Sequence, residues 1–327
     1  MRPEPRTLPR LLSESAARFA GRVFAREKRD GAWRDTTYAE MHDRVRRFAA
    51  GLAELGFAPG DRAALLSEGR TDWITAELGI LGAGGVNVPL SVKLDDPAEL
   101  RFRLEHAGCR VAVVSGSLLD RVAGFLGALP ALETIVALDA PLEPRPGVVD
   151  LAALLESGAV RLARDPDGCA RIWDNVREDD PANICYTSGT TADPKGIVLS
   201  HRNYVANAEQ SGAIVPVRPD SATLIILPWD HAFAHTCGVY TFLRVGASLA
   251  AVAPGATPQE ALRRIPESIR EIRPTLLLSV PALAANFRKN IEKGIRQKGK
   301  LAERLFRGAL HLAYAFNQDG FNRGCGW

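Results

Sequence analysis

Short apolar segments alternate with helix-like segments along most of this chain, and no other feature limits its fold as strongly. We expect strands at residues 62–67, 86–90, 110–115, 134–138, 183–187 and 196–200. Strands that are apolar over their whole length and are connected through helices are typical of parallel sheets with both faces covered. The sequence therefore predicts an α/β protein with mostly parallel sheets covered by helices.

Several of the expected helices begin at recognisable capping residues. Thr37 and Glu40 have the spacing of a capping box, in which each side chain bonds to the backbone N–H of the other, and they open a helix near residue 38. The apolar residues of that helix share one face: Met41, Val45, Phe48, Leu52 and Leu55. Asp96 before Pro97 predicts another helix start, because proline is favoured at the first helical position. Further helices are expected at 72–84, 118–129, from 201 onward, and at 258–272, 281–294 and 301–316.

The pattern is weaker between residues 141 and 180, where Pro, Asp and Arg are frequent. We therefore expect a boundary there, with a first α/β subdomain at 1–177 and a second at 178–327. Within the second, strands are also expected at 222–228, 247–253 and 275–280.

The charges are nearly balanced, since 41 lysines and arginines face 38 aspartates and glutamates, for a net charge of +3. This balance gives no argument for a nucleic-acid partner. Residues 288–300 form a local basic cluster. We interpret it as a solvated helix face, with a peripheral membrane contact as the alternative.

The cysteines are dispersed and show no metal-like spacing: Cys109, Cys169, Cys185, Cys237 and Cys325. Such a set is typical of reduced thiols, so we expect a cytoplasmic protein. The first ten residues have no apolar core of the kind that an export signal needs. The most apolar long window, residues 74–92, contains Glu77 and several glycines, so we interpret it as buried helix, turn and strand.

One loop, "YTSGTTADPKG" at residues 186–196, combines hydroxyls, two glycines and a single lysine. Glycines let the backbone approach an anion, hydroxyls donate to phosphate oxygens, and a lysine supplies compact positive charge. The spacing differs from the Walker loop, because Pro194 rather than glycine precedes Lys195. The composition thus indicates an oligophosphate site, with a plain polar hairpin between two strands as the alternative.

The same loop closely resembles the phosphate-loop signature of the adenylate-forming superfamily, the AMP-dependent synthetases and ligases. Other segments resemble that family in the same order, among them "WITAELGILGAGGVNVPL" and "LPWDHAFAH". The segments "IREIRPTLLLSVPALAANFRKNI" and "LAERLFRGALHLAYAF" look most like the long-chain fatty acyl-CoA synthetases. The resemblance implies a large N-terminal adenylation domain with stacked sheets. The family's later motifs and its small C-terminal domain are absent, so we expect the domain to be incomplete at its C-terminus.

The resemblance also implies a chemistry. A carboxylic acid, expected to be a medium- or long-chain fatty acid, reacts with ATP to give an acyl-adenylate, and coenzyme A then takes the acyl group. Mg²⁺ would bridge phosphate oxygens. The residues implied to hold the phosphates are Thr187, Ser188, Gly189, Thr190, Thr191, Lys195 and Gly196. Of these, Lys195 and Thr190 are implied to be catalytic, together with His231 near the acid and the α-phosphate.

Alternatives stay open for His231 and for the whole chain. His231 could instead be a core histidine, and its spacing to His235 is one that zinc sites use, although no third ligand accompanies them. A fatty acyl-AMP ligase or an aryl-acid adenylating enzyme would share the loop. A non-catalytic domain that at most binds a nucleotide or a partner is the rival from another class. We expect residues 1–327 alone to be inactive.

Overall fold

The computed structural model describes residues 6–141, 143–187, 194–253 and 258–317, and it divides into two compact units. The first is Met1–Leu278 and the second is Ser279–Trp327. The subdomain boundary expected near residue 177 falls inside the first unit and stays a prediction.

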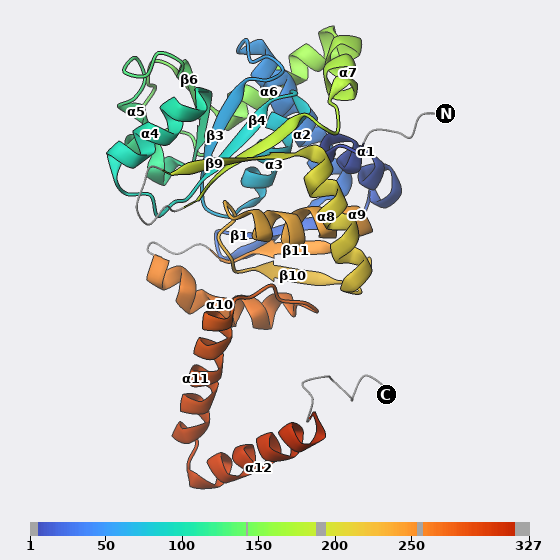
Figure 1. Cartoon of the computed structure of the whole chain (residues 1–327), viewed down its shortest axis with the longest axis vertical. Coiled ribbons are helices and arrows are strands. Elements are labelled where there is room, and N and C mark those ends of the chain that lie inside the picture. Colours follow the sequence, from blue (N-terminus) through green and yellow to red (C-terminus); the bar gives the residue numbers. More distant parts are fainter. Residues whose placement is uncertain (1–5, 142, 188–193, 254–257, 318–327) are drawn as a thin grey trace. The chain divides into compact units, whose positions relative to one another are not determined.

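A seven-stranded sheet forms the larger part of the first unit (Figure 1). Its order is β7-β6-β5-β3-β4-β8-β9, and every neighbouring pair is parallel except β8 and β9. The strands are β3 (Arg62–Leu66), β4 (Val86–Leu90), β5 (Cys109–Val114), β6 (Thr134–Ala137), β7 (Val148–Asp150), β8 (Pro181–Thr187) and β9 (Lys195–Ser200). The expected mostly parallel α/β fold is confirmed.

Helices cover both faces of this sheet, because alternate residues of its strands enter two different cores. Leu65 and Val113 belong to the core that also includes helices α2 (Tyr38–Glu54), α3 (Thr71–Gly82) and α6 (Leu151–Arg164). Their neighbours Leu66 and Val114 belong to the core formed with α4 (Pro97–Ala107) and α5 (Leu119–Ala123). Helix α2 has the expected capping box between Thr37 and Glu40. Two-sided burial explains why these strands are apolar throughout.

A second sheet of four strands has the order β10-β11-β1-β2. It consists of β10 (Ala222–Ile225), β11 (Ser248–Ala251), β1 (Val23–Arg29) and β2 (Ala32–Thr37). One continuous core includes residues of both sheets, such as Leu65 of β3 and Leu249 of β11. Helices α1 (Leu8–Phe19), α8 (His201–Ile214) and α9 (Thr241–Val245) contribute to that core, as does a π-helical turn, η2 (Ala234–Tyr240). Helix α10 (Pro258–Ile272) contacts β10.

Two expectations about elements are wrong, and one segment contains helices that were not expected. The run 275–280 does not form a strand and makes only an isolated bridge, between Leu276 and Thr223. The helix expected at 118–129 is the short α5, preceded by a 3-10 turn at Gly116–Leu118. The weakly patterned segment 141–180 contains two helices, α6 and α7 (Pro166–Asn175).

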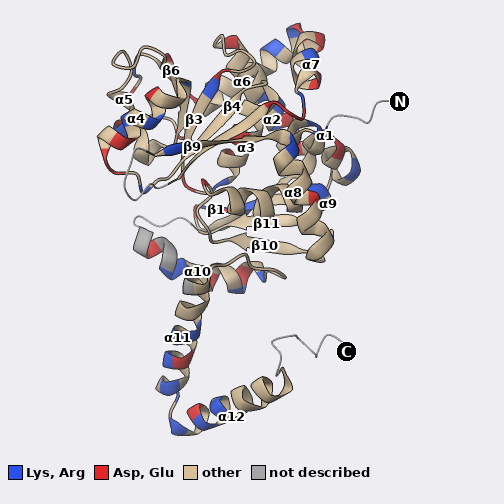
Figure 2. Ribbon diagram, viewed as in Figure 1, with Lys and Arg blue, Asp and Glu red and all other residues tan. Residues whose placement is uncertain are grey.

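The second unit contains helices α11 (Pro281–Gln297) and α12 (Lys300–Phe316), and it includes the whole basic cluster at 288–300. Figure 2 shows acidic residues among the basic ones on these helices. Arg288 pairs with Glu292 at 2.9 Å, and Arg296 lies 3.5 Å from Glu303. These pairs favour the solvated helix face over a basic binding patch. Among the residues that the structure describes, no helix has the length and apolar content needed to cross a membrane.

Candidate active site

The hairpin of β8 and β9 places three of the expected phosphate-binding residues together. Thr187 and Lys195 are directly opposite each other at the open end of the strand pair, and Gly196 is opposite Tyr186. Both Thr187 and Lys195 are exposed. Across the described ranges, the ammonium of Lys195 makes no hydrogen bond and no ion pair. The remaining expected residues, Ser188, Gly189, Thr190 and Thr191, lie outside the described residues.

Tyr186 fixes this hairpin to helix α4. Its hydroxyl lies 2.8 Å from Nδ1 of His106 and donates to the carbonyl of Arg103 at 3.3 Å. Burial raises the pKa of Tyr186 to about 12, so the phenol stays protonated. A side chain at Gly196 would meet Ile184, since an added Cβ would lie 2.9 Å from its Cγ2. The glycine thus allows close packing within the hairpin, whatever its part in binding phosphate.

A fully buried carboxylate stands behind the hairpin. Glu77 of α3 accepts hydrogen bonds from the hydroxyl of Tyr240, from Nδ2 of Asn87 and, at 3.0 Å, from Nδ2 of Asn183 on β8. Burial raises the pKa of Glu77 to about 7, while the bonds from Tyr240 and Asn183 act in the opposite direction. Burial thus favours the protonated form of Glu77, and its hydrogen bonds favour the carboxylate.

The same cluster continues to His235. Nδ2 of Asn183 donates to the Tyr204 hydroxyl at 3.1 Å, and that hydroxyl lies 3.0 Å from Nε2 of His235. Nδ1 of His235 lies 3.1 Å from the carbonyl of Trp229, so Nδ1 carries the proton and Nε2 accepts from Tyr204. Burial lowers the pKa of His235 to about 4. Strand β8 is thus connected to the segment "LPWDHAFAH" through neutral, directional hydrogen bonds.

His231 has a different environment from His235. It is exposed, and its Nδ1 accepts from the backbone N–H of Phe233 at 3.3 Å. With Nδ1 as the acceptor, the neutral ring carries its proton on Nε2, which is left as a donor. The core-histidine interpretation therefore describes His235 and not His231. Beside it, burial raises the pKa of Asp230.

Trp229 occupies space that a glycine leaves open. An added Cβ at Gly69 would lie 2.0 Å from Nε1 of Trp229, so any other residue there would collide with the indole. The Trp229 ring packs edge-on against Trp73, with 5.5 Å between centroids, and Trp73 stacks on His235 at 6.0 Å. These aromatic contacts hold the segment before His231 against α3.

No local sequence pattern predicts the buried cluster around Glu77. Its members are Glu77, Asn87, Asn183, Tyr204, His235 and Tyr240. One signal was available, because Glu77 is the single charged residue in the apolar window 74–92. A carboxylate in such a window requires buried hydrogen-bond partners.

The family model described as "AMP-binding enzyme" matches residues 12–314 of the chain. The chain is 31% identical, over 79% of its length, to a 3-[(3aS,4S,7aS)-7a-methyl-1,5-dioxo-octahydro-1H-inden-4-yl]propanoyl:CoA ligase of Rhodococcus jostii, and it covers 50% of that protein. It is 29% identical, over 83% of its length, to long-chain-fatty-acid–CoA ligase FadD15 of Mycobacterium bovis and covers 43% of it. The chain thus spans about half the length of the curated relatives it matches.

A solved structure has the same fold. The anthranilate CoA ligase AuaEII, crystallised with anthranoyl-AMP, superposes with a TM-score of 0.73 at 22% identity. The match covers 84% of this chain and 50% of that one.

Proposed function

The chain belongs to the AMP-binding enzyme family, and we propose that it provides the phosphate-binding part of an ATP-dependent ligase joining a carboxylic acid to coenzyme A. In the first step a carboxylate oxygen of the acid bonds to the α-phosphorus of ATP, and pyrophosphate leaves. In the second step the thiol sulfur of coenzyme A bonds to the acyl carbon, AMP leaves, and the thiol proton passes to solvent.

The environment of Lys195 carries this proposal. An exposed ammonium with no partner in the described structure is available to an anion, and it stands beside the Thr187 hydroxyl at the open end of a hairpin. Phosphoryl transfer depends mostly on positioning and on neutralising charge, which is what an ammonium and hydroxyls provide. We propose that Ser188, Gly189, Thr190 and Thr191 complete the contacts to the β- and γ-phosphates. Mg²⁺, when bound with ATP, would neutralise further phosphate charge there.

His231 is the second residue that we propose to act in the reaction. Its Nε2–H is left as a donor once Nδ1 accepts from Phe233, and we propose that it donates to the acid's carboxylate or to the α-phosphate. The Asn183–Tyr204–His235 hydrogen bonds support this role, since they connect β8 of the hairpin to the turn that carries His231. A fixed distance between the two is needed if both act on one ATP.

A medium- or long-chain fatty acid is the proposed substrate. FadD15 is named for long-chain fatty acids, and the Rhodococcus ligase is named for a bicyclic propanoate, so both names indicate acids with large apolar bodies.

Acid-dependent exchange of labelled pyrophosphate into ATP tests the proposed function, measured on the full polypeptide as its gene encodes it. We expect exchange with fatty acids, and we expect Lys195→Ala to reduce it about tenfold to a hundredfold, the usual cost of one charge-assisted contact. Exchange that is absent with every acid would contradict the ligase activity. Exchange unchanged in Lys195→Ala would remove Lys195 from the site.

A further inference from the structure

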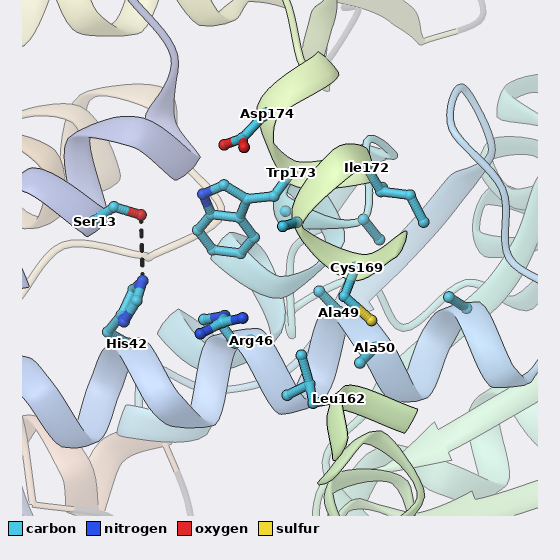
Figure 3. Close-up of a pocket in the computed structure, with 14 residues that line it drawn as sticks. Ser13, His42, Arg46, Ala49, Ala50, Leu162, Cys169, Ile172, Trp173 and Asp174 are labelled. Carbon is cyan, nitrogen blue, oxygen red and sulfur yellow. Dashed lines mark hydrogen bonds between the residues drawn. The ribbon is translucent and has the colours of Figure 1, made fainter. Parts of the chain in front are cut away.

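A pocket of about 200 Å³ lies among helices α1, α2, α6 and α7 and the C-terminal end of α3 (Figure 3). None of its lining residues belongs to the β8–β9 hairpin or to the segment 227–235. It is therefore separate from the proposed ATP site, and the proposed chemistry gives it no role.

The pocket is hollow because its floor consists of very small residues and its wall is a fixed aromatic ring. The floor includes Ala49 and Ala53 of α2 together with Gly82. An added Cβ at Gly82 would lie 2.3 Å from Cζ3 of Trp173, so the indole rests directly on the glycine. The Trp173 ring also meets the His42 ring edge-on, with 5.9 Å between centroids. These contacts fix one flat apolar wall beside an apolar floor.

One side of the pocket is cationic, and its cation lacks a partner. Arg46 is partly buried, and no residue in the described part of the chain makes a hydrogen bond or an ion pair with its guanidinium. The next residue, Arg47, pairs with Asp43 at 2.8 Å and does not line the pocket. A partly buried guanidinium without an anion is unfavourable, and its five donors fit a carboxylate. The guanidinium of Arg46 is therefore available to an anion inside the pocket.

The neighbouring His42 supplies a neutral contact. Its Nε2 lies 3.2 Å from Oγ of Ser13, and that hydroxyl already donates to the carbonyl of Pro9 at 3.2 Å. Nε2 of His42 is consequently the donor to Ser13. Burial, and after it the charge of Arg46, lowers the pKa of His42, so the ring is neutral at pH 7. The charged residues that line the pocket are therefore Arg46 and Asp174, and Arg46 is the one cation among the described lining residues.

We propose that this pocket binds a small monocarboxylate with a flat apolar body. The carboxylate pairs with the guanidinium of Arg46, and the body lies between the Trp173 indole and the alanine floor. Figure 3 shows Asp174 and Arg46 on opposite sides of the Trp173 ring, so the carboxylate of Asp174 does not occupy the anion position. A volume of about 200 Å³ corresponds to roughly seven waters of the liquid, which suits a molecule of the size of benzoate.

Cys169 gives a direct readout of occupancy, because it lines the pocket as a free and partly exposed thiol. The experiment follows alkylation of Cys169 by peptide-resolved mass spectrometry, with benzoate as the probe and without ATP. We expect benzoate to slow the alkylation of Cys169 saturably, with a Kd of about 1 mM, as befits so few atoms. Alkylation of Cys237, which does not line the pocket, is the internal control and should not change.

Matched variants separate the parts of the proposal. Arg46→Gln should weaken the protection about tenfold or more, whereas Arg47→Gln on the same helix should leave it unchanged. Ala53→Leu should abolish it by filling the floor. Lys195→Ala should keep the protection of Cys169, because the pocket and the hairpin share no residue. The test of this pocket is therefore independent of the test of the proposed ATP site.

Several results would overturn the proposal. They are no saturable protection at concentrations about tenfold above the expected Kd, equal protection in Arg46→Gln, and equal protection by benzyl alcohol, which lacks the charge. Equal protection by sulfate would also overturn it, since it would show an anion site without the apolar component.

Discussion

The side-chain amide of Asn183 lies 3.0 Å from the carboxylate of Glu77, so a residue of strand β8 is hydrogen-bonded to the interior of helix α3. Asn183 has a second bond, to the Tyr204 hydroxyl at 3.1 Å. The strand that leads into the proposed phosphate loop is therefore held from behind by buried polar groups. Hydrogen bonds are strong in a low-dielectric interior, so these two bonds fix the position of β8 against α3 and α8.

Glu77 makes stability depend on pH. Its pKa is raised to about 7 in the folded chain and is about 4.3 in an unfolded one. The folded state thus holds more protons between these values, and its stability falls as pH rises from about 4.3 to 7. In Glu77→Gln this dependence should disappear.

His235 contributes the opposite trend, since its pKa is lowered to about 4. The folded state then holds fewer protons than the unfolded one, and stability falls as pH decreases from about 6.5 to 4. The measurement is the difference in unfolding free energy between wild type and Glu77→Gln, taken at each pH across this range. His235 is present in both proteins, so its contribution cancels in the difference. A difference that does not change with pH would show that Glu77 titrates normally.

We expect the two histidines of "LPWDHAFAH" to differ in their effect on stability, with a large loss from removing His235 and a small loss from removing His231. His235→Ala removes a fully buried ring and leaves the Tyr204 hydroxyl without its acceptor and the Trp229 carbonyl without its donor, so we expect a loss of about 2–4 kcal/mol. His231→Ala removes an exposed ring and one cap to Phe233, so we expect a loss below about 1 kcal/mol. Denaturant midpoints give the stabilities. The proposed function adds that His231→Ala slows adenylation; similar losses of stability for both variants would refute the distinction.

Asp72 is predicted to stabilise the fold. Its carboxylate is 2% exposed and pairs with Arg29 at 2.6 Å, Arg44 at 2.6 Å and Arg70 at 3.0 Å. Asp72→Asn replaces the buried anion that the three arginines share, while Arg29 and Arg70 keep their pairs with Glu27 and Asp139, so we expect a loss of about 1.5–3 kcal/mol. Asp139→Asn is the control, because it also pairs with Arg70 but is 45% exposed. It should cost less than about 1 kcal/mol, and equal losses from the two would contradict the prediction.

Periodicity and capping residues predicted most of the seven-stranded sheet and its helices. The strand pattern at 62–66 and the capping box at Thr37 and Glu40 are both present in the structure. These signals are local, so a sequence contains them in full. The hairpin of β1 and β2 was missed although Asp30-Gly31 is a strong turn signal, and both residues have positive φ there. The start of α7 was missed in the same way, since Asp165 caps it just before Pro166.

Local sequence patterns do not predict features that depend on contacts between distant residues. The run 275–280 is as apolar as a strand, but whether a strand forms depends on a neighbour, and only Leu276 finds one. The contacts of Glu77 bring together residues from 77 to 240 of the chain, so no local spacing indicates them. The cationic side of the pocket lined by Arg46 likewise depends on tertiary contacts. Of the adjacent residues Arg46 and Arg47, it is Arg47 that pairs with Asp43.

Binding of MgATP to this chain, measured by isothermal titration calorimetry, tests the central claim most directly. The claim is that the β8–β9 hairpin binds the phosphates through Lys195, which is exposed and opposite Thr187. We expect wild type to bind MgATP and Lys195→Ala to bind it about tenfold to a hundredfold more weakly. Lys289→Ala, which changes an exposed lysine on α11, should bind as wild type does. Equal affinity of wild type and Lys195→Ala for MgATP would contradict the account.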